Sequence, residues 1–355
     1  MNTMSEVRKQ PDGTIAPTTL EPPSGSCSAA HRPRGDFRLV HISDPHLSRQ
    51  FYPEHLKSFK LLLKSILASG CDHLVITGDI VSTANETDYT LAREILGTLG
   101  FLESSRLTVV PGNHDIFGGP HRAVDILSFP QYIRSVDYQR NLERFRLTFS
   151  ETFDGVKFLA EDSAFPFLKN VGPYALIGLN SIPPWSIRKN PLGTNGALDE
   201  QQRSLFSDAT LKSELGNRTP LVAMHHHFND LQDQSIGGSF WKRVESNTMR
   251  MRGRKRALRM FQSAGVKYIL HGHIHCNDIW QHGSITLLNG AGAVCDDPHR
   301  FLKYNEILIE ANQERVRTVT LPIPYQVPSY ALPLRHLRYP VNLRSLPASA
   351  KLTNA

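Results

Sequence analysis

The sequence predicts an α/β fold in which parallel strands alternate with helices. Short apolar runs of strand length alternate with longer segments whose apolar residues recur at helical spacing. Several of the predicted strands end in carboxylate, carboxamide or imidazole side chains. With 355 residues, of which 40% are hydrophobic and 21% charged, the composition is that of a globular chain large enough to bury a core without disulfide bonds.

The first half of the chain contains three strands, each followed by a polar turn. The strands with their turns are 37–47, 72–81 and 106–115, and the helices between them are 53–70 and 86–100. The segment after them, about 116–170, is less regular and is expected to form helices and excursions over a site. Strands that alternate with helices indicate βαβ crossovers, and in such sheets the ligand crevice lies beyond the carboxyl ends of the strands.

In the second half of the chain, predicted strands again alternate with predicted helices. Strands are predicted at 174–181, 219–228 and 266–275, helices at 198–212 and 253–265, and closing β-structure at 284–294, 304–310 and 314–323. Asp199 or a neighbour is expected to cap the helix at 198–212. We predict one folded domain at 36–323, preceded by a flexible arm rich in Pro, Ser, Thr and Gly at 1–35 and followed by a Pro-rich basic tail at 324–355.

Charge and cysteine content narrow the class of protein. The formal net charge is +7, and much of the excess lies in 249–260 and 334–345. A basic stretch is either a solvated helix face or a surface that attracts an anionic substrate. The 4 cysteines form no CxxC pair, which argues against a disulfide framework or a thiolate zinc site and fits a reducing compartment. The sequence contains no apolar run of about 18 residues and no secretory signal pattern, so we expect a cytoplasmic protein.

Five predicted strand ends carry side chains that bind metal ions. They read DPH at 44–46, GD at 78–79, GNHD at 112–115, HHH at 225–227 and HGHIH at 271–275. This mixture of oxygen and imidazole donors suits Zn, Mn, Fe or similar ions better than Ca or a thiolate-bound cluster. In an extended backbone, side chains two residues apart project to the same side, so the pairs in DPH and HIH are expected to reach one ion or two adjacent ions. Gly78 and Gly112 permit the backbone to pass close to such a centre.

The order of these motifs resembles the calcineurin-like metallophosphoesterase superfamily over about residues 37–310. The phrases LVHISDPHL, VITGDIV, VVPGNHD and YILHGHIH are similar to its cyclic-nucleotide phosphodiesterase (class III) branch. The resemblance implies a four-layer α/β/β/α sandwich of two mixed sheets, with the site at the loop edge of both sheets. It also implies a site for two metal ions.

The resemblance assigns a role to each motif residue. The first ion is expected on Asp44, His46 and His275, the second on Asn113, His225 and His273, and Asp79 is expected to bridge both. His226 is the rival of His225, because Phe228 stands where the family often has a proline. The resemblance makes His114 the residue that protonates the leaving group or stabilises charge there. It makes Asp115 the residue that orients His114 by a hydrogen bond, and it leaves the role of His271 undetermined.

The implied function is metal-dependent hydrolysis of a phosphoric ester through a metal-bound hydroxide, with Fe, Mn, Zn or Co as the metals. The favoured substrate is a small phosphodiester of nucleotide type, such as a cyclic nucleotide. A phosphomonoesterase, a nuclease and a pyrophosphatase with the same site are the alternatives. The basic stretch at 249–260 slightly favours a larger polyanion, but a small phosphodiester is favoured over nucleic acid as the partner. A non-catalytic scaffold is the remaining alternative, and it is disfavoured because competent residues fill every ligand position.

Overall fold

A computed structural model describes residues 36–121, 123–161, 163–228, 249, 251–274, 277–294, 301–311 and 313–324. The arm predicted at 1–35 lies outside these residues, as does the tail predicted at 324–355 apart from Pro324. The described residues form two mixed β-sheets with helices. None of the described helices has the length and apolar character needed to cross a membrane.

The first sheet has five strands in the order β12-β11-β1-β2-β3. The three parallel strands are β1 (Phe37–Ile42), β2 (His73–Ile76) and β3 (Leu107–Val109). The strand β11 (Phe301–Glu310) pairs antiparallel with β1, and β12 (Gln313–Pro322) pairs antiparallel with β11. Helices α1 (Pro53–Ala68) and α2 (Glu86–Thr98) make the two crossovers. In α1 the buried Phe59, Leu62 and Ile66 recur at spacings of three and four, which places them on one helix face.

The second sheet has seven strands in the order β4-β5-β6-β7-β8-β10-β9. Its parallel strands are β6 (Tyr174–Gly178), β7 (Thr219–Ala223), β8 (Tyr268–His271) and β10 (Ile285–Asn289). The antiparallel strands are β4 (Lys157–Phe158), β5 (Phe167–Val171) and β9 (Asp278–His282). Helices α6 (Glu200–Leu205), α7 (Ala209–Leu215) and α9 (Arg254–Ser263) belong to this half.

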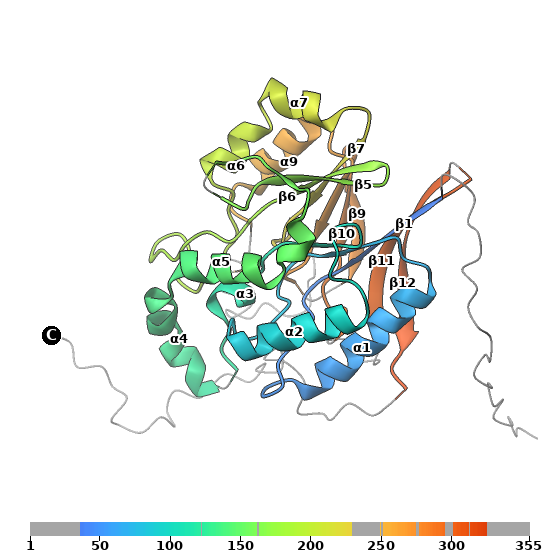
Figure 1. Ribbon diagram of the computed structural model, residues 1–355. Helices are drawn as coiled ribbons and strands as arrows, with labels where there is room; N and C mark the ends of the chain where they lie inside the picture. The colour runs from blue at the N-terminus through green and yellow to red at the C-terminus, as the bar shows by residue number, and fades with distance from the viewer. Residues whose placement is uncertain are drawn as a thin grey trace, which may run out of the picture. The chain divides into compact units, whose positions relative to one another are not determined.

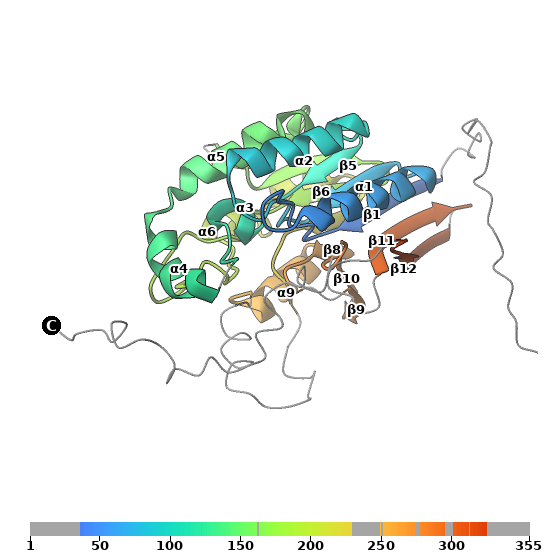
Figure 2. The same cartoon turned by 90° about the horizontal axis from the view of Figure 1, so that it is seen from below.

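The two sheets pack face to face between two layers of helices. One hydrophobic cluster joins residues of both sheets, including Leu39 of β1, Leu176 of β6 and Leu270 of β8. A second cluster joins the outer face of the second sheet to its helices, as in the contact of Phe206 with Phe261. Figure 1 shows α1 and α2 on one side of the sheets and α6, α7 and α9 on the other, and Figure 2 keeps α1 and α2 on the side away from α9. The predicted four-layer sandwich of two mixed sheets is confirmed.

Several predicted elements differ from those observed. The helix predicted at 198–212 is two helices, because Asp208 accepts a hydrogen bond from Thr210 N at 2.8 Å and starts α7. The predicted cap Asp199 is confirmed, since its carboxylate accepts from Gln202 N at 2.8 Å. Strands β4, β5 and β9 were not predicted.

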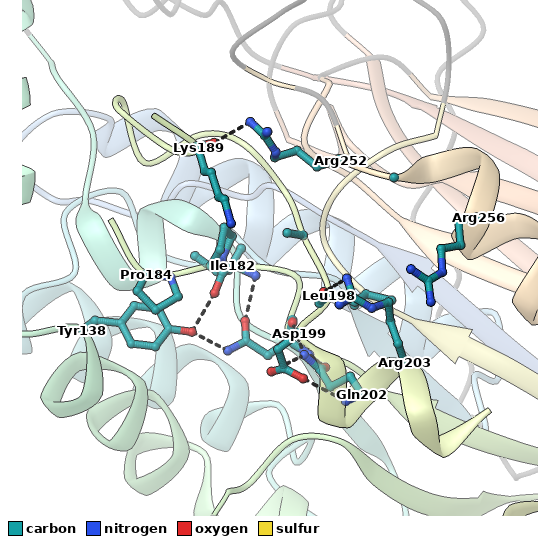
Figure 3. Close-up of a pocket in the computed structure, with 14 residues that line it drawn as sticks. Tyr138, Ile182, Pro184, Lys189, Leu198, Asp199, Gln202, Arg203, Arg252 and Arg256 are labelled. Atoms are coloured by element: carbon teal, nitrogen blue, oxygen red, sulfur yellow. Dashed lines mark hydrogen bonds between the residues drawn. The ribbon is translucent and has the colours of Figure 1, made fainter. Parts of the chain in front are cut away.

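The irregular region after the third strand is mostly helical. It contains α3 (Asn113–Phe117), α4 (Ala123–Ser135), α5 (Tyr138–Thr148) and the 3₁₀ helix η1 (Ser150–Phe153). The GNHD motif, predicted as a turn, is instead the start of α3. Beside the carboxyl end of β6, a cavity of about 510 Å³ opens between the loop 180–199, α6 and the start of α9 (Figure 3).

Candidate metal centre

The loops after β1, β2, β3, β7 and β8 meet at the carboxyl edge of the two sheets. Backbone hydrogen bonds fasten neighbouring loops together, from Asp44 N to Gly78 O at 3.0 Å and from His46 N to Asp79 O at 3.0 Å. In the second sheet, Gly272 N donates to His225 O at 2.8 Å. The sequence order of the five motifs is therefore converted into one compact group of loops, as predicted from the strand ends.

The candidate residues lie in strained turns and not in extended backbone. Asp44 (φ 58°), His46 (φ 44°), Asp79 (φ 50°) and His273 (φ 77°) all have positive φ, which is uncommon for residues other than glycine. The expectation that DPH projects two side chains from an extended strand is wrong, because β1 ends at Ile42. Such strain concentrates at functional sites, where the surrounding structure holds it in place.

Two glycines permit the close approach of these loops. A Cβ atom added to Gly78, which has φ 89°, would lie 2.5 Å from Gly112 N and 2.8 Å from His225 Nδ1. A Cβ atom added to Gly112 would overlap the backbone and carboxylate of Asp79. The prediction that these glycines let backbone pass close to the candidate ligands is confirmed.

One group of candidate ligands surrounds Nε2 of His225. This atom lies 3.1 Å from Asn113 Oδ1, 3.0 Å from His273 Nδ1 and 3.4 Å from Asp79 Oδ2. The opposite ring atom, His225 Nδ1, lies 2.8 Å from the carbonyl of Thr77. Because a carbonyl only accepts, Nδ1 carries a proton, which is how histidines that bind metals are usually oriented.

The electrostatics of this group favour a cation. Burial lowers the pKa of His225, but the Asp79 carboxylate outweighs burial and raises that pKa to about 9. The side chains around Nε2 thus stabilise a positive charge, and a metal cation would replace this proton. Ligand atoms of Asp79, His225 and His273 all lie within 4.8 Å of one another, so these residues fit a metal ion.

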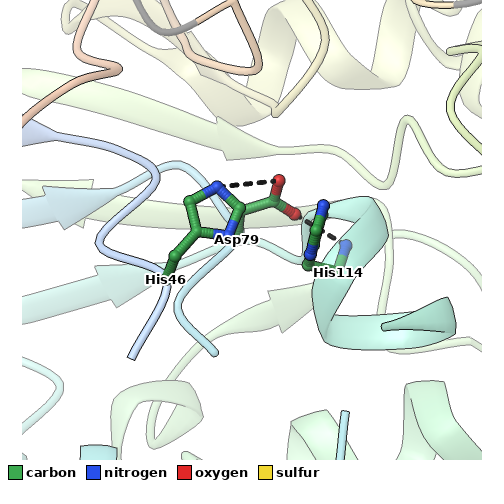
Figure 4. Close-up of side chains that lie close together, drawn as sticks. All are labelled: His46, Asp79 and His114. Atoms are coloured by element: carbon green, nitrogen blue, oxygen red, sulfur yellow. Dashed lines mark hydrogen bonds and ion pairs between the residues drawn. The ribbon is translucent and has the colours of Figure 1, made fainter. Parts of the chain in front are cut away.

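A second group shares Asp79 with the first. Ligand atoms of His46, Asp79 and His114 also lie within 4.8 Å of one another (Figure 4). His46 Nε2 is 3.7 Å from Asp79 Oδ2 and 3.9 Å from Asp44 Oδ1. Because one buried carboxylate belongs to both groups, the edge has the form of a dinuclear centre. His275, predicted as a further ligand, lies outside the described residues.

His114 is oriented by a backbone carbonyl. Its Nδ1 lies 3.2 Å from Ser82 O, and its own backbone N donates to Asp79 Oδ1 at 2.8 Å. Because a carbonyl only accepts, this contact is a hydrogen bond that Nδ1 donates to Ser82 O. The ring also meets that of His46 edge to face, with centroids 4.5 Å apart.

The expected hydrogen bond between Asp115 and His114 is wrong. The Asp115 carboxylate accepts instead from Gly112 N at 2.8 Å and from Val81 N at 3.0 Å, because it caps the start of α3 and ties that helix to the loop after β2. Burial and the neighbouring Asp79 carboxylate raise the pKa of Asp115 to about 8, although these two backbone donors oppose the shift. The sequence does not predict that the backbone carbonyls of Ser82 and Thr77 orient His114 and His225, because residue type gives no signal for a backbone contact.

The three consecutive histidines face different surroundings. His226 contacts Ser181 Oγ through Nδ1 at 2.9 Å and Thr194 O through Nε2 at 3.2 Å. Both of its nitrogens are therefore engaged away from Asp79, and the geometry favours His225 as the ligand. His227 stacks on His273 with ring centroids 5.8 Å apart. His271 ends β8 fully buried, with its ring centroid 6.1 Å from that of Phe228.

The chain matches one family model and is similar in fold to solved structures. The family model described as "Calcineurin-like phosphoesterase" matches residues 37–277. A dimetal phosphatase from Danio rerio is similar in fold, with a TM-score of 0.50 and 13% identity over 81% of this chain and 98% of that one. The purple acid phosphatase PPD1 from yellow lupin (Lupinus luteus) seeds has a TM-score of 0.47 and 12% identity over 80% of this chain and 53% of that one. No curated protein matches the sequence.

Proposed function

Because the chain belongs to the calcineurin-like phosphoesterase family, we propose that it hydrolyses a small phosphodiester with two metal ions bound where the loops of both sheets meet. It is a phosphoric ester hydrolase with His and Asp residues in its metal site. The observation that carries the proposal is the Asp79 carboxylate, which belongs to both groups of candidate ligands.

We assign the ligands in two sets around that carboxylate. One ion would be held by Asp44, His46 and His275 and the other by Asn113, His225 and His273, with Asp79 available to both. This set offers carboxylate, carboxamide and imidazole donors, which accept Fe, Mn, Zn or Co, so availability decides which metal is bound.

The chain supplies the remaining parts of the reaction. When bound, two metal cations polarise the phosphate and lower the pKa of a water molecule that attacks phosphorus. Ser82 O accepts a hydrogen bond from His114 Nδ1, and we propose that His114 in its imidazolium form donates its Nε2 proton to the leaving oxygen. Asp115 keeps the loops after β2 and β3 in register, so that Asp79 and Asn113 stay in place.

A small phosphodiester of nucleotide type, such as a cyclic nucleotide, is the substrate we favour. The resemblance of the four motif phrases to the cyclic-nucleotide branch supports this choice. A phosphomonoesterase, a nuclease and a pyrophosphatase remain alternatives because they use the same two-metal chemistry.

Hydrolysis of bis(p-nitrophenyl) phosphate by the Mn-loaded protein tests the proposal. The variant Asp79→Asn is expected to lose bound metal and to lower kcat/KM about a thousandfold, because both ions lose a shared charged ligand. Asp72→Asn is the matched control, since it removes a carboxylate at the opposite end of the same strand β2. Faster hydrolysis of p-nitrophenyl phosphate than of the diester would favour the phosphomonoesterase. A protein that binds two ions and hydrolyses neither compound would contradict the proposal and favour a scaffold.

A further inference from the structure

The cavity beside β6 has the size and rigidity of a ligand pocket. Its volume of about 510 Å³ lies within the range of small-molecule sites. Hydrogen bonds fix its floor, because Asn180 Nδ2 donates to the Tyr138 hydroxyl at 2.8 Å and Asn180 N donates to Gln202 Oε1 at 2.9 Å (Figure 3). Both amide side chains are buried, so the floor is formed before any ligand arrives.

The lining of this cavity is strongly positive, and we refer to it as the cationic cavity. The basic lining residues come from the loop after β6, from α6 and from the start of α9: Lys189, Arg203, Arg252 and Arg256. Asp199 is the acidic lining residue, and its carboxylate is occupied by the N–H groups of Gln202 at 2.8 and 3.0 Å.

The positive charge is only partly compensated. Arg203 pairs with Glu200 on its own helix. Within the part of the chain that the structure describes, no carboxylate forms an ion pair with Lys189, Arg252 or Arg256. Figure 3 shows Arg252 and Arg256 extending from one side of the cavity and Lys189 from the loop above Ile182.

The first turn of α9 adds to this positive potential. It contains Arg254, Lys255 and Arg256, has no acidic residue and begins at Gly253 without a side-chain cap. Cations at a helix N-terminus are unfavourable, because the helix dipole is positive there. The helix dipole of α9 therefore does not favour Lys255 and Arg256 at this end, whereas a bound anion would interact favourably with both the side chains and the helix.

Two buried residues, Ser181 and His226, lie between the cationic cavity and the metal centre. Asn180 lines the cavity, and its neighbour Ser181 contacts His226 Nδ1 through Oγ at 2.9 Å. The His226 ring centroid is 4.5 Å from that of His273. Backbone hydrogen bonds from Ala197 N to Ser181 O at 3.0 Å and from Arg252 N to Gly196 O at 2.7 Å hold the cavity wall in place.

We propose that the cationic cavity binds a second, non-scissile phosphate of the substrate. This inference rests on the proposed function, since it assumes that the scissile phosphodiester lies at the metal centre. A phosphomonoester carries a charge of about −1.5 to −2 at pH 7, and guanidinium groups bind it through paired hydrogen bonds. Within the nucleotide-type phosphodiesters of the proposed function, this narrows the substrate class to those that also carry a phosphomonoester group, which a simple cyclic nucleotide lacks.

Two chromogenic substrates test the proposal: the p-nitrophenyl ester of thymidine 5′-phosphate and the same compound with an added 3′-phosphate. With the Mn-loaded protein we expect the 3′-phosphate to lower KM about tenfold, which corresponds to about 1.4 kcal/mol. Arg256→Gln is expected to abolish this advantage. Arg259→Gln is the matched control, because Arg259 is an exposed arginine of the same helix that does not line the cavity.

The outcomes separate this inference from the proposed function. If both substrates are hydrolysed with equal KM, the cavity is not a phosphate site, and the proposed function stays intact. The same holds if Arg256→Gln and Arg259→Gln reduce the KM advantage of the 3′-phosphate equally. If protein with two bound ions hydrolyses neither substrate, the proposed function is wrong. Calorimetric titration then tests whether the cavity binds a phosphate group. Thymidine 3′,5′-bisphosphate would then bind more tightly than thymidine 5′-phosphate only if Arg256 is present, and equal affinities would overturn the inference.

Discussion

The metal centre and the cationic cavity adjoin each other but are constructed in different ways. Asp79 and His225 are at most 2% exposed, and backbone of positive φ sets the position of Asp79. In the cavity, Lys189, Arg252 and Arg256 are exposed side chains on a loop and at the start of a helix. Buried loops of positive φ thus hold the candidate metal ligands, whereas the basic side chains that line the cavity are exposed at the surface.

Removal of the His114 ring gives the largest effect expected at the metal centre. We predict that His114→Ala lowers kcat on bis(p-nitrophenyl) phosphate about a thousandfold, because proton donation to the leaving oxygen is lost. The variant is expected to keep both metal ions, since we assign His114 to the leaving group and not to a metal. Metal analysis of the purified variant beside the kinetics checks this, and loss of one ion would make His114 a ligand.

The effect of close packing at the metal centre is tested with two glycines of positive φ, one crowded and one open. Gly78→Ala is expected to lower the free energy of unfolding by about 3 kcal/mol, because positive φ is unfavourable for alanine and the new Cβ would collide with Gly112. Gly216→Ala, at φ 55° with nothing within 4 Å of the added Cβ, should lower it by only about 1 kcal/mol.

Denaturant unfolding of both variants measures this difference. Equal losses would show that the close packing of the metal-centre loops adds nothing to the strain of positive φ.

The metal-centre motifs were predictable from sequence because they are short and each follows a strand. The conclusion that Asp44 and His46 reach one site was drawn from extended geometry, yet the structure achieves it with positive φ at both residues. Residue type does not reveal this, because φ is set by hydrogen bonds between loops such as that from Asp44 N to Gly78 O. Asp115 was given a wrong contact for the same reason, since its partners are backbone N–H groups.

The cationic cavity was less accessible to sequence analysis. The basic stretch at 249–260 was noticed, with a solvated helix face and an anionic substrate as the two interpretations. Only the fold shows that Arg252 and Arg256 line a cavity with Lys189 and Arg203, which are distant in sequence. The break between α6 and α7 was also missed, because Asp208 fits a helix interior and a helix cap equally well by pattern alone.

Substitution of adjacent histidines distinguishes a ligand from its support. His225→Ala is expected to weaken metal binding more than a hundredfold, because its Nε2 atom faces Asn113 and Asp79. His226→Ala should weaken it by about tenfold or less, since the ring contacts Ser181 and Thr194 and only supports its neighbours. Competition with a fluorescent chelator measures both affinities, and the reverse order would assign His226 as the ligand.

Ionic strength gives the smallest and most direct test of the difference between the two regions. Exposed charges are screened over about 10 Å at 0.1 M salt, whereas buried groups are screened much less. Between about 50 and 300 mM NaCl, we expect the KM of the 3′-phosphorylated substrate to rise about threefold and that of the unphosphorylated one to change little. In Arg256→Gln, the KM of the 3′-phosphorylated substrate should depend less on salt, because the variant removes one of the exposed charges. Identical salt dependence of the two substrates in the wild-type protein would mean that the metal centre alone binds both, and that exposed cations play no part in selection.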